Sequence, residues 1–160
     1  HLYFTDGDVV GYDTNLKVNP PLRSIEDQQA LKQALLDGTI DCIATHHLPQ
    51  DIDHKIVEFE YAHFGMVGLE TSFAVIKTCF PGLGLEKTIE LLSAKPRMLF
   101  DLQTAPINND AQACLTLFLP EEKWTVNQLH SKSKNSPFLG KVLTGKPVGI
   151  INKEKVFLNQ

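Results

Sequence analysis

A double proline followed by a capped amphipathic helix is the feature of this sequence that most restricts its fold. The two prolines disfavour helical geometry in the residue before each ring, so we expect residues 11–23 to be extended. Ser24 suits the cap of a helix over residues 25–37, because a serine oxygen accepts a hydrogen bond from a first-turn backbone N–H. Gly38 suits its end, since glycine adopts the left-handed conformation at little cost.

A short, mostly apolar run, residues 39–45, follows this helix. Such a run between a glycine and a polar loop is typical of a buried parallel strand. The helix offers an apolar stripe on which the strand would pack, formed by Leu31, Ala34 and Leu35. Extended segment, helix and strand in this order predict a βαβ unit, and α/β proteins place their chemistry in the loop after the strand.

The loop after the predicted strand, "IATHHLPQDIDHK" over residues 43–55, holds three histidines, two aspartates and a lysine. Adjacent residues of an extended segment point in opposite directions, so at most one of His46 and His47 can face a site. His46 is our candidate for a site role, and His47 is expected to be structural. The alternative interpretation makes His46 an ordinary polar loop residue.

Further metal-ligand types gather at the end of this loop and just beyond it. His54 and His63, together with Asp51, Asp53 and Glu58, offer donors that zinc accepts. Their spacing matches no specific zinc pattern, so a solvated acidic loop is the preferred interpretation.

The pattern changes from helical to β-type near residue 105. Helical segments are expected over residues 71–79, 85–92 and 95–102. Short β-rich runs are expected over residues 113–120, 123–126, 140–152 and 155–160, with an irregular polar loop at 131–140. We therefore expect an α/β part over residues 1–105 and a small β part over residues 106–160.

Composition narrows the class of protein. The chain is 42% hydrophobic and carries a net charge of −4, which gives no electrostatic reason to expect nucleic acid or an anionic membrane as partner. It has no apolar run long enough to span a membrane. Its three widely spaced cysteines are expected to be buried free thiols in a cytoplasmic protein. The chain begins with His1, so we expect that residues before it have been removed.

Six ordered blocks of the sequence resemble the C-terminal portion of dihydroorotase, a family of the amidohydrolase superfamily. They are KVNPPLR (17–23), DGTIDCIAT (37–45), GLET (68–71), SAKPRMLFDL (93–102), ACLTLFLPEEKWTV (113–126) and SKSKNSPFLGKVLTGKPVGIIN (131–152). The resemblance implies a metal-dependent hydrolase of pyrimidine biosynthesis, which interconverts N-carbamoyl-L-aspartate and L-dihydroorotate. It also implies the last strands and helices of a (β/α)8 barrel, followed by segments of a small composite β domain. At 160 residues the chain is well short of the ~250 of a complete barrel.

The resemblance also assigns site residues. Asn19 matches an asparagine that donates to the substrate, and Phe64 with Gly65 matches a segment whose backbone contacts the substrate. The family's active-site block has the form T-D-H-A-P-H, where this chain has Thr-His-His-Leu-Pro-Gln. His46 thus stands in place of the aspartate that binds metal and acts as general base, and Gln50 in place of a substrate-binding histidine. The resemblance therefore implies a catalytic and metal-binding role for His46 and a substrate-binding role for Gln50.

These two departures leave three functions open. Imidazole can bind a metal or accept a proton, and a glutamine can still donate a neutral hydrogen bond, so a dihydroorotase is the first hypothesis. The second is an inactive dihydroorotase-like protein with a structural or regulatory role. The third is an amidohydrolase for another cyclic amide or ureide.

Most of the family's metal ligands lie on earlier strands than this chain contains. The chain alone is therefore expected to be inactive and to bind no zinc, although zinc is expected in the full-length parent. The expected partners are the small-molecule substrate and either a second copy of the chain or the N-terminal part, because a partial barrel leaves strand edges and apolar surface uncovered.

Overall fold

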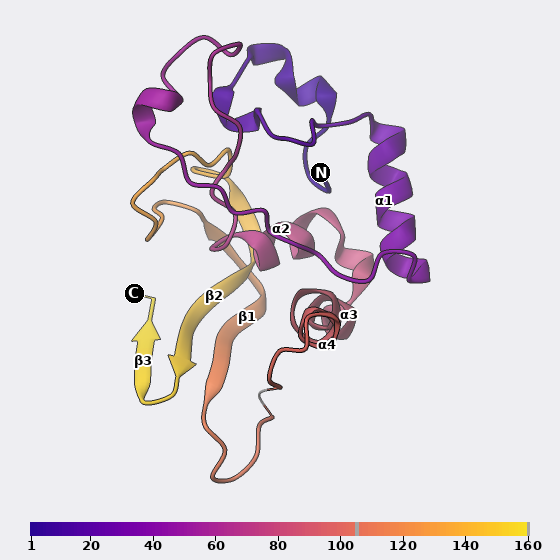
Figure 1. Ribbon diagram of the computed structural model, residues 1–160, viewed down its shortest axis with the longest axis vertical. Helices are drawn as coiled ribbons and strands as arrows, with labels where there is room; N and C mark the ends of the chain where they lie inside the picture. The colour runs from indigo at the N-terminus through magenta and orange to yellow at the C-terminus, as the bar shows by residue number, and fades with distance from the viewer. Residues whose placement is uncertain (105, 160) are drawn as a thin grey trace.

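A computed structural model describes residues 1–104 and 106–159 of the chain (Figure 1). Its α-helices are α1 (Ile25–Asp37), α2 (Ser72–Cys79), α3 (Leu85–Ile89) and α4 (Lys95–Leu99). Its strands are β1 (Cys114–Thr125), β2 (Val142–Asn152) and β3 (Lys155–Leu158). Figure 1 shows α2 between the loops of the N-terminal half and the C-terminal sheet, so that this helix connects the two.

Helix α1 has the predicted bounds. The Ser24 hydroxyl oxygen accepts a hydrogen bond from the backbone N–H of Asp27 at 3.3 Å, and Gly38 ends the helix with a φ of 85°. Leu35, which is 2% exposed, packs in a cluster to which Ile40 and Ile43 also belong. The helix therefore packs against the segment that follows it, as the apolar stripe predicts.

The predicted buried strand over residues 39–45 is wrong. These residues are half-buried or exposed and belong to no strand. Among the described residues, the backbone of 41–45 makes one hydrogen bond, from the N–H of Ile43 to the carbonyl of Leu91 at 3.0 Å. A strand requires a neighbouring strand for its backbone groups, and here Leu91 belongs to a helical turn. The βαβ unit is therefore not formed by the described residues.

The segment before the double proline is less extended than predicted. Residues Asp6–Gly11 and Thr14–Leu16 form 3-10 helices. The Asp13 carboxylate accepts the backbone N–H of Asn15 at 2.9 Å, and such a local hydrogen bond favours a tight turn over an extended chain. The prediction of an extended segment over residues 11–23 is thus wrong for its first half.

The helical segments after residue 70 lie where the pattern predicts them. Helix α2 covers most of residues 71–79 and is followed by a 3-10 turn at Pro81–Leu83. Helices α3 and α4 are joined by a π-helical turn over Glu90–Ala94, so the two predicted helices form one run.

The C-terminal residues form one antiparallel sheet in the order β1-β2-β3. The β-rich runs over residues 113–120 and 123–126 are parts of the single strand β1, whose register against β2 shifts between Leu119 and Lys123. The loop at 131–140 is irregular, as predicted. The last residue of the predicted run over residues 155–160 lies outside the described residues.

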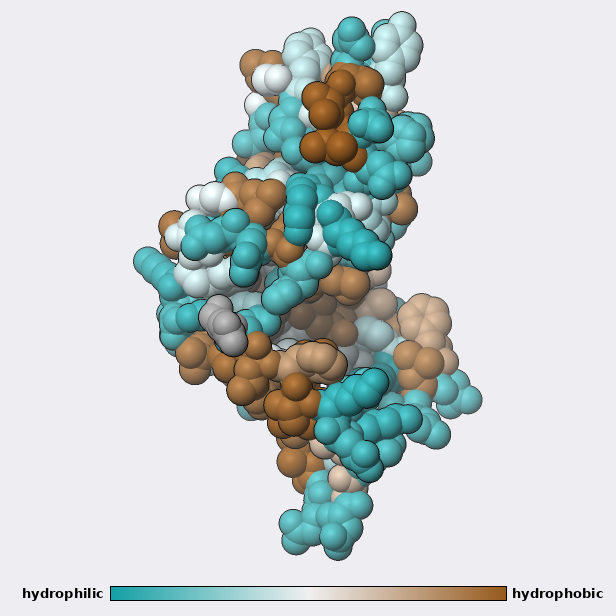
Figure 2. All heavy atoms as spheres, turned by 90° about the vertical axis from the view of Figure 1, so that its left-hand side faces the viewer, coloured by the Kyte–Doolittle hydropathy of each residue, from teal (hydrophilic) through white to brown (hydrophobic). Residues whose placement is uncertain are grey.

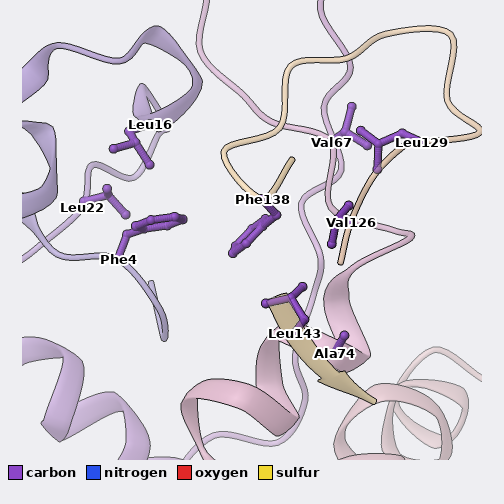
Figure 3. Packing of buried hydrophobic residues seen from close by; sticks show 9 residues of the cluster. All are labelled: Phe4, Leu16, Leu22, Val67, Ala74, Val126, Leu129, Phe138 and Leu143. Atoms are coloured by element: carbon purple, nitrogen blue, oxygen red, sulfur yellow. The ribbon is translucent and has the colours of Figure 1, made fainter. Parts of the chain in front are cut away.

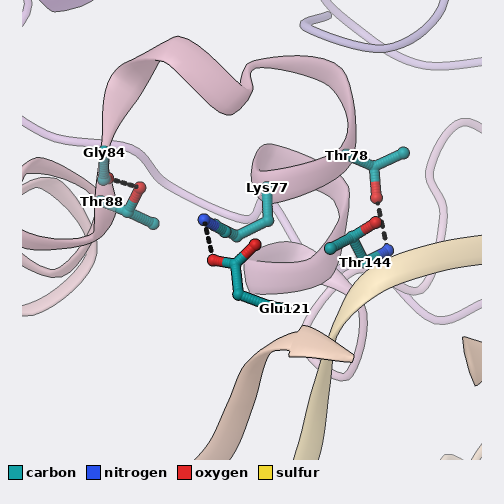
Figure 4. A network of polar contacts seen from close by, with 6 residues as sticks. All are labelled: Lys77, Thr78, Gly84, Thr88, Glu121 and Thr144. Carbon is teal, nitrogen blue, oxygen red and sulfur yellow. Dashed lines mark hydrogen bonds and ion pairs between the residues drawn. The ribbon is translucent and has the colours of Figure 1, made fainter. Parts of the chain in front are cut away.

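A hydrogen bond and an ion pair fasten α2 to this sheet (Figure 4). The backbone N–H of Thr144 on β2 donates to the Thr78 hydroxyl at 2.8 Å. The Lys77 ammonium lies 3.0 Å from the Glu121 carboxylate of β1. Helix α2 is thus held on the sheet.

The main hydrophobic core contains residues from both ends of the chain (Figure 3). Phe4, Leu22 and Val67 belong to the N-terminal half, and Phe138 and Leu143 to the C-terminal part. The Phe4 and Phe138 rings have centroids 5.3 Å apart. The boundary expected at residue 105 lies outside the described residues, and the division into two parts stays a prediction.

The cysteines differ from expectation in their burial. All three are free thiols, but Cys42 and Cys79 are half-buried and Cys114 is exposed at the start of β1. Cys114 lies on a strand, where successive side chains point to opposite faces, so its apolar neighbours in sequence do not cover it. No helix within the described residues is long and apolar enough to cross a membrane.

Candidate functional site

A cavity of about 360 Å³ lies where the N-terminal segment, the loop after Ile43, the 64–68 segment and α2 meet. Most of its wall is apolar, with a few polar groups. Four residues that the sequence predicts for a site line it together: Asn19, His46, Phe64 and Gly65. The fifth, Gln50, is not on its wall. An apolar cavity with a few convergent polar groups is typical of a small-molecule site.

His46 and the neighbouring His47 have different environments, but His46 has a positive φ, so the alternation of an extended segment is not the cause of the difference. His46 lines the cavity, is exposed and has a φ of 46°. The Nδ1 of His47 accepts the backbone N–H groups of Gly68 and Leu69 at 3.1 and 3.4 Å, so this nitrogen carries no proton. His47 thus holds the residues just before α2, whereas His46 is available to a ligand.

Gln50 is engaged with the site backbone. Its side-chain amide donates to the carbonyl of Phe64 at 3.0 Å, while its own backbone N–H donates to Asn135 Oδ1 at 3.0 Å. The Gln50 amide therefore orders a carbonyl of the segment that the resemblance assigns to the substrate.

Phe64 and Gly65 are held closely against the loop. The backbone N–H of Gly65 donates to the carbonyl of Lys17 at 2.9 Å, and the Lys17 ammonium lies 4.9 Å from the centre of the Phe64 ring. Gly65 has a φ of 117°, and an added Cβ would lie 2.7 Å from three Leu48 atoms. This position therefore requires glycine.

Asn19 also lines the cavity, directly ahead of the double proline. It is exposed, and within residues 1–104 and 106–159 its side-chain amide makes no hydrogen bond. An amide with both donors free suits it to meet a carbonyl or carboxylate of a ligand.

Lys55 has a structural environment. It is 8% exposed, and its ammonium donates to the carbonyls of Thr14 and His63 at 2.8 and 2.7 Å. Burial lowers the pKa of Lys55, an effect that the nearby Asp13 partly offsets. The lysine thus joins the end of the site loop to the N-terminal segment.

Sequence reasoning missed Asn135, which contacts both segments that carry the predicted site residues. It lies in the polar loop before β2 and is 5% exposed. Its amide donates to the carbonyls of Leu48 and Gly65 at 3.1 and 3.2 Å. No local pattern could have revealed it, because these partners lie 87 and 70 residues away along the chain.

The donors in the described part of the chain do not suffice for a metal ion. On the described cavity wall, the side chains of a type that binds zinc are those of His1 and His46. Zinc sites use three or four protein donors. Across residues 1–104 and 106–159, no group of three or more His, Cys, Asp or Glu side chains could hold a metal. The His54 and His63 rings stack with centroids 3.9 Å apart and planes 13° apart, so they face one another rather than a shared point.

Similar proteins of known sequence are dihydroorotases. The dihydroorotase of Trichlorobacter lovleyi is 48% identical over 149 residues, which cover 89% of this chain and 35% of that protein. The dihydroorotase of Staphylococcus epidermidis is 40% identical over 165 residues, covering 100% of this chain and 39% of that protein. The chain thus spans little more than a third of the length of these relatives. No family model matches it.

Similar solved structures include a hydantoinase and a dihydroorotase-like domain. An L-hydantoinase (dihydropyrimidinase) of Arthrobacter aurescens has a TM-score of 0.85 at 28% identity, covering 99% of this chain and 38% of that one. The inactive dihydroorotase-like domain of a CAD-like multifunctional protein of Chaetomium thermophilum has a TM-score of 0.66 at 22% identity, covering 97% of this chain and 40% of that one. The second likeness concerns the fold alone.

The fold and the cavity together define a portion of an amidohydrolase. Within that class, the chain belongs to the dihydroorotase family and corresponds to the C-terminal portion of its members. The resemblance found from the six sequence blocks is thereby confirmed.

Proposed function

We propose that this chain is part of a longer dihydroorotase, a metal-dependent cyclic-amide hydrolase that interconverts N-carbamoyl-L-aspartate and L-dihydroorotate. The observation that carries the proposal is the cavity that brings together Asn19, His46, Phe64 and Gly65, in a chain 40–48% identical to several dihydroorotases. In this proposal the 1–104 part contributes helices and the His46 loop to a (β/α)8 barrel, the segment over residues 39–45 becomes a strand only against the rest of the longer protein, and the chain alone is inactive.

Each cavity residue has a role in this proposal. The free amide of Asn19 donates to a substrate oxygen, and the backbone of Phe64 and Gly65 borders the ring. The imidazole of His46 serves as general base or as one metal ligand. A neutral imidazole has one unprotonated nitrogen, so His46 accepts a proton only while that nitrogen does not bind the metal.

Gln50 has an indirect role in this proposal, through the backbone of Phe64, and a direct role when its side chain turns to the substrate. Its amide orders the Phe64 carbonyl, so it shapes the backbone that faces the substrate. The resemblance implies that Gln50 contacts a substrate carboxylate. For this, its side-chain amide must release the Phe64 carbonyl and donate to the carboxylate instead. Either way it supplies a neutral donor.

The metal in this proposal is zinc, held mainly by residues beyond this chain. In this chain, His46 of the site loop is the metal ligand on the cavity wall. The remaining ligands come from other strands of the longer protein. The metal supplies an activated water when it is bound. We also propose a cytoplasmic location, which the three free cysteines support.

Exposed apolar surface supports an association with the remainder of the protein or with a second copy. Figure 2, viewed from the side on which β3 lies, shows apolar side chains gathered below the middle of the view. On β3, Val156, Phe157 and Leu158 are 58%, 57% and 61% exposed. Met98 and Phe100, at the end of α4, are 75% and 68% exposed. Surface of this kind is rarely left uncovered.

An inactive dihydroorotase-like protein is the second candidate. The site loop carries His46 where the family has a carboxylate, and the Gln50 amide is occupied by the Phe64 carbonyl. An inactive dihydroorotase-like domain also shares this fold. A protein of this kind would keep the cavity and its hydrogen bonds without turnover.

The test is turnover of L-dihydroorotate by the purified full-length protein, with its zinc content measured alongside. Hydrolysis that depends on bound zinc supports the proposal. A folded protein without turnover favours the inactive alternative. A preference for hydantoin or dihydrouracil over dihydroorotate would instead indicate an amidohydrolase for another cyclic amide.

A further inference from the structure

Asn135 makes a set of hydrogen bonds that uses its whole side-chain amide. Its Nδ2 donates to the carbonyls of Leu48 and Gly65 at 3.1 and 3.2 Å, and its Oδ1 accepts the backbone N–H of Gln50 at 3.0 Å. Its own carbonyl accepts the N–H of Val67 at 2.9 Å. One residue thus binds four backbone groups.

The four groups belong to two segments that are separate along the chain. Leu48 and Gln50 lie in the loop that carries His46, whereas Gly65 and Val67 lie in the segment that follows Phe64. Each of these two segments contributes to the cavity wall. Asn135 itself is 5% exposed and is not on that wall.

Other contacts between the two segments do not fix the same atoms. The N–H of Leu48 donates to the carbonyl of Met66 at 2.9 Å, and His47 and Met66 form an isolated bridge. These contacts lie on one side of Leu48. On the other side, the Gln50 side chain donates to the Phe64 carbonyl at 3.0 Å, whereas the Leu48 carbonyl and the Gln50 N–H are bound by Asn135.

We propose that Asn135 is a positioning residue, which sets the distance between the His46 loop and the backbone of Phe64 and Gly65. The inference rests on the proposed function for its catalytic consequence, because that distance determines how a substrate between the two segments meets His46. It also has a consequence that does not depend on function. Without the amide, the N–H of Gln50 and two carbonyls lose their partner.

Aspartate at position 135 gives a sharper perturbation than alanine. It keeps the size of the side chain and the acceptor for the Gln50 N–H, but replaces the donor by a carboxylate oxygen that faces two carbonyl oxygens. A protonated carboxyl group restores one donor. The defect of Asn135→Asp should therefore diminish as the pH falls, whereas that of Asn135→Ala should not.

The experiment compares both variants with Asn127→Ala and Asn127→Asp in the full-length protein. Asn127 is an exposed asparagine of the same part of the chain, outside the cavity wall, so its variants control for the change of composition. The readouts are kcat and KM for L-dihydroorotate as a function of pH, and backbone hydrogen exchange of peptides covering residues 47–51 and 64–68.

We expect Asn135→Ala to lower kcat/KM on the order of 10²-fold, the scale of a small misplacement in a site. Exchange should rise by about tenfold or more in both peptides, with no change over residues 25–37. Asn135→Asp should regain activity relative to the unaltered protein at acid pH. The Asn127 variants should change neither readout.

Unchanged exchange in both peptides of a folded Asn135 variant would overturn the proposal. If Asn135→Ala does not fold, the size-matched Asn135→Asp decides, and a defect in it that is independent of pH counts against the proposal. If the unaltered protein has no turnover, the proposed function fails, and hydrogen exchange alone decides the role of Asn135.

Discussion

Replacing Gly65 by alanine should damage the site more than its small size suggests. Gly65 has a φ of 117°, which L-residues with a side chain rarely adopt. The new Cβ would lie 2.7 Å from the Cβ, Cγ and Cδ2 atoms of Leu48. Rotation of the Leu48 side chain cannot relieve this overlap, since the Leu48 Cβ is fixed to the backbone.

The expected cost has two parts. A non-glycine residue in a sparsely populated backbone region costs roughly 1–3 kcal/mol. Overpacking against a held neighbour costs about 1–3 kcal/mol, and hydrogen bonds to its N–H and its carbonyl hold Leu48 here. Gly65→Ala should thus lower the free energy of unfolding by about 2–6 kcal/mol.

Gly82→Ala is the matched control. An added Cβ at Gly82 would meet nothing within 4 Å, and its backbone needs no left-handed geometry. This substitution should raise the free energy of unfolding by roughly 0.4–1 kcal/mol, because alanine restricts the unfolded chain. Urea unfolding of both variants of the full-length protein is the assay. Equal stabilities of Gly65→Ala and Gly82→Ala would refute the argument from the Leu48 contact.

Three further substitutions test neighbouring parts of the account. His46→Ala should lower kcat on the order of 10²-fold if the imidazole moves the proton, and an unchanged kcat would reduce His46 to a polar loop residue. His47→Ala should leave kcat nearly unchanged but lower stability by about 1–2 kcal/mol in urea unfolding, because the N–H groups of Gly68 and Leu69 lose their acceptor. Lys55→Met should remove part of the dependence of the free energy of unfolding on pH at alkaline pH. Burial lowers the folded-state pKa of Lys55, so its contribution to stability should increase as the pH rises from that pKa towards about 10.5. If the free energies of unfolding of the unaltered protein and of Lys55→Met rise in parallel with pH over this range, the assignment is wrong.

The elements that could be predicted from the sequence are those defined by local chemistry. Helix α1 has the expected bounds because its cap, Ser24, and its terminating Gly38 are adjacent to it in sequence. Strands β2 and β3 follow one another through a tight turn, so their pairing is local, whereas residues 126–141 separate β1 from β2. The predicted strand over residues 39–45 failed for the opposite reason, since a strand depends on partners that the run itself does not specify.

The same distinction holds for the candidate site. The His46 loop was predicted because it follows a run expected to be a buried strand and because it matches the family's active-site block. The strand is not formed, but the structure brings His46 together with Asn19 and Phe64 on one cavity wall. The position of Gln50 away from that wall could not be predicted, because its partner Phe64 is set by the fold. Asn135 was missed in the same way. Its role is visible only when segments distant in sequence are adjacent in space.

The most direct test of the account is a crystal structure of the full-length protein with L-dihydroorotate bound. The account predicts the ligand in the cavity, with the Asn19 amide and the backbone of Phe64 or Gly65 within hydrogen-bond distance of it and the His46 imidazole facing the scissile amide. A ligand bound elsewhere, with this cavity empty or filled by protein side chains, would contradict it.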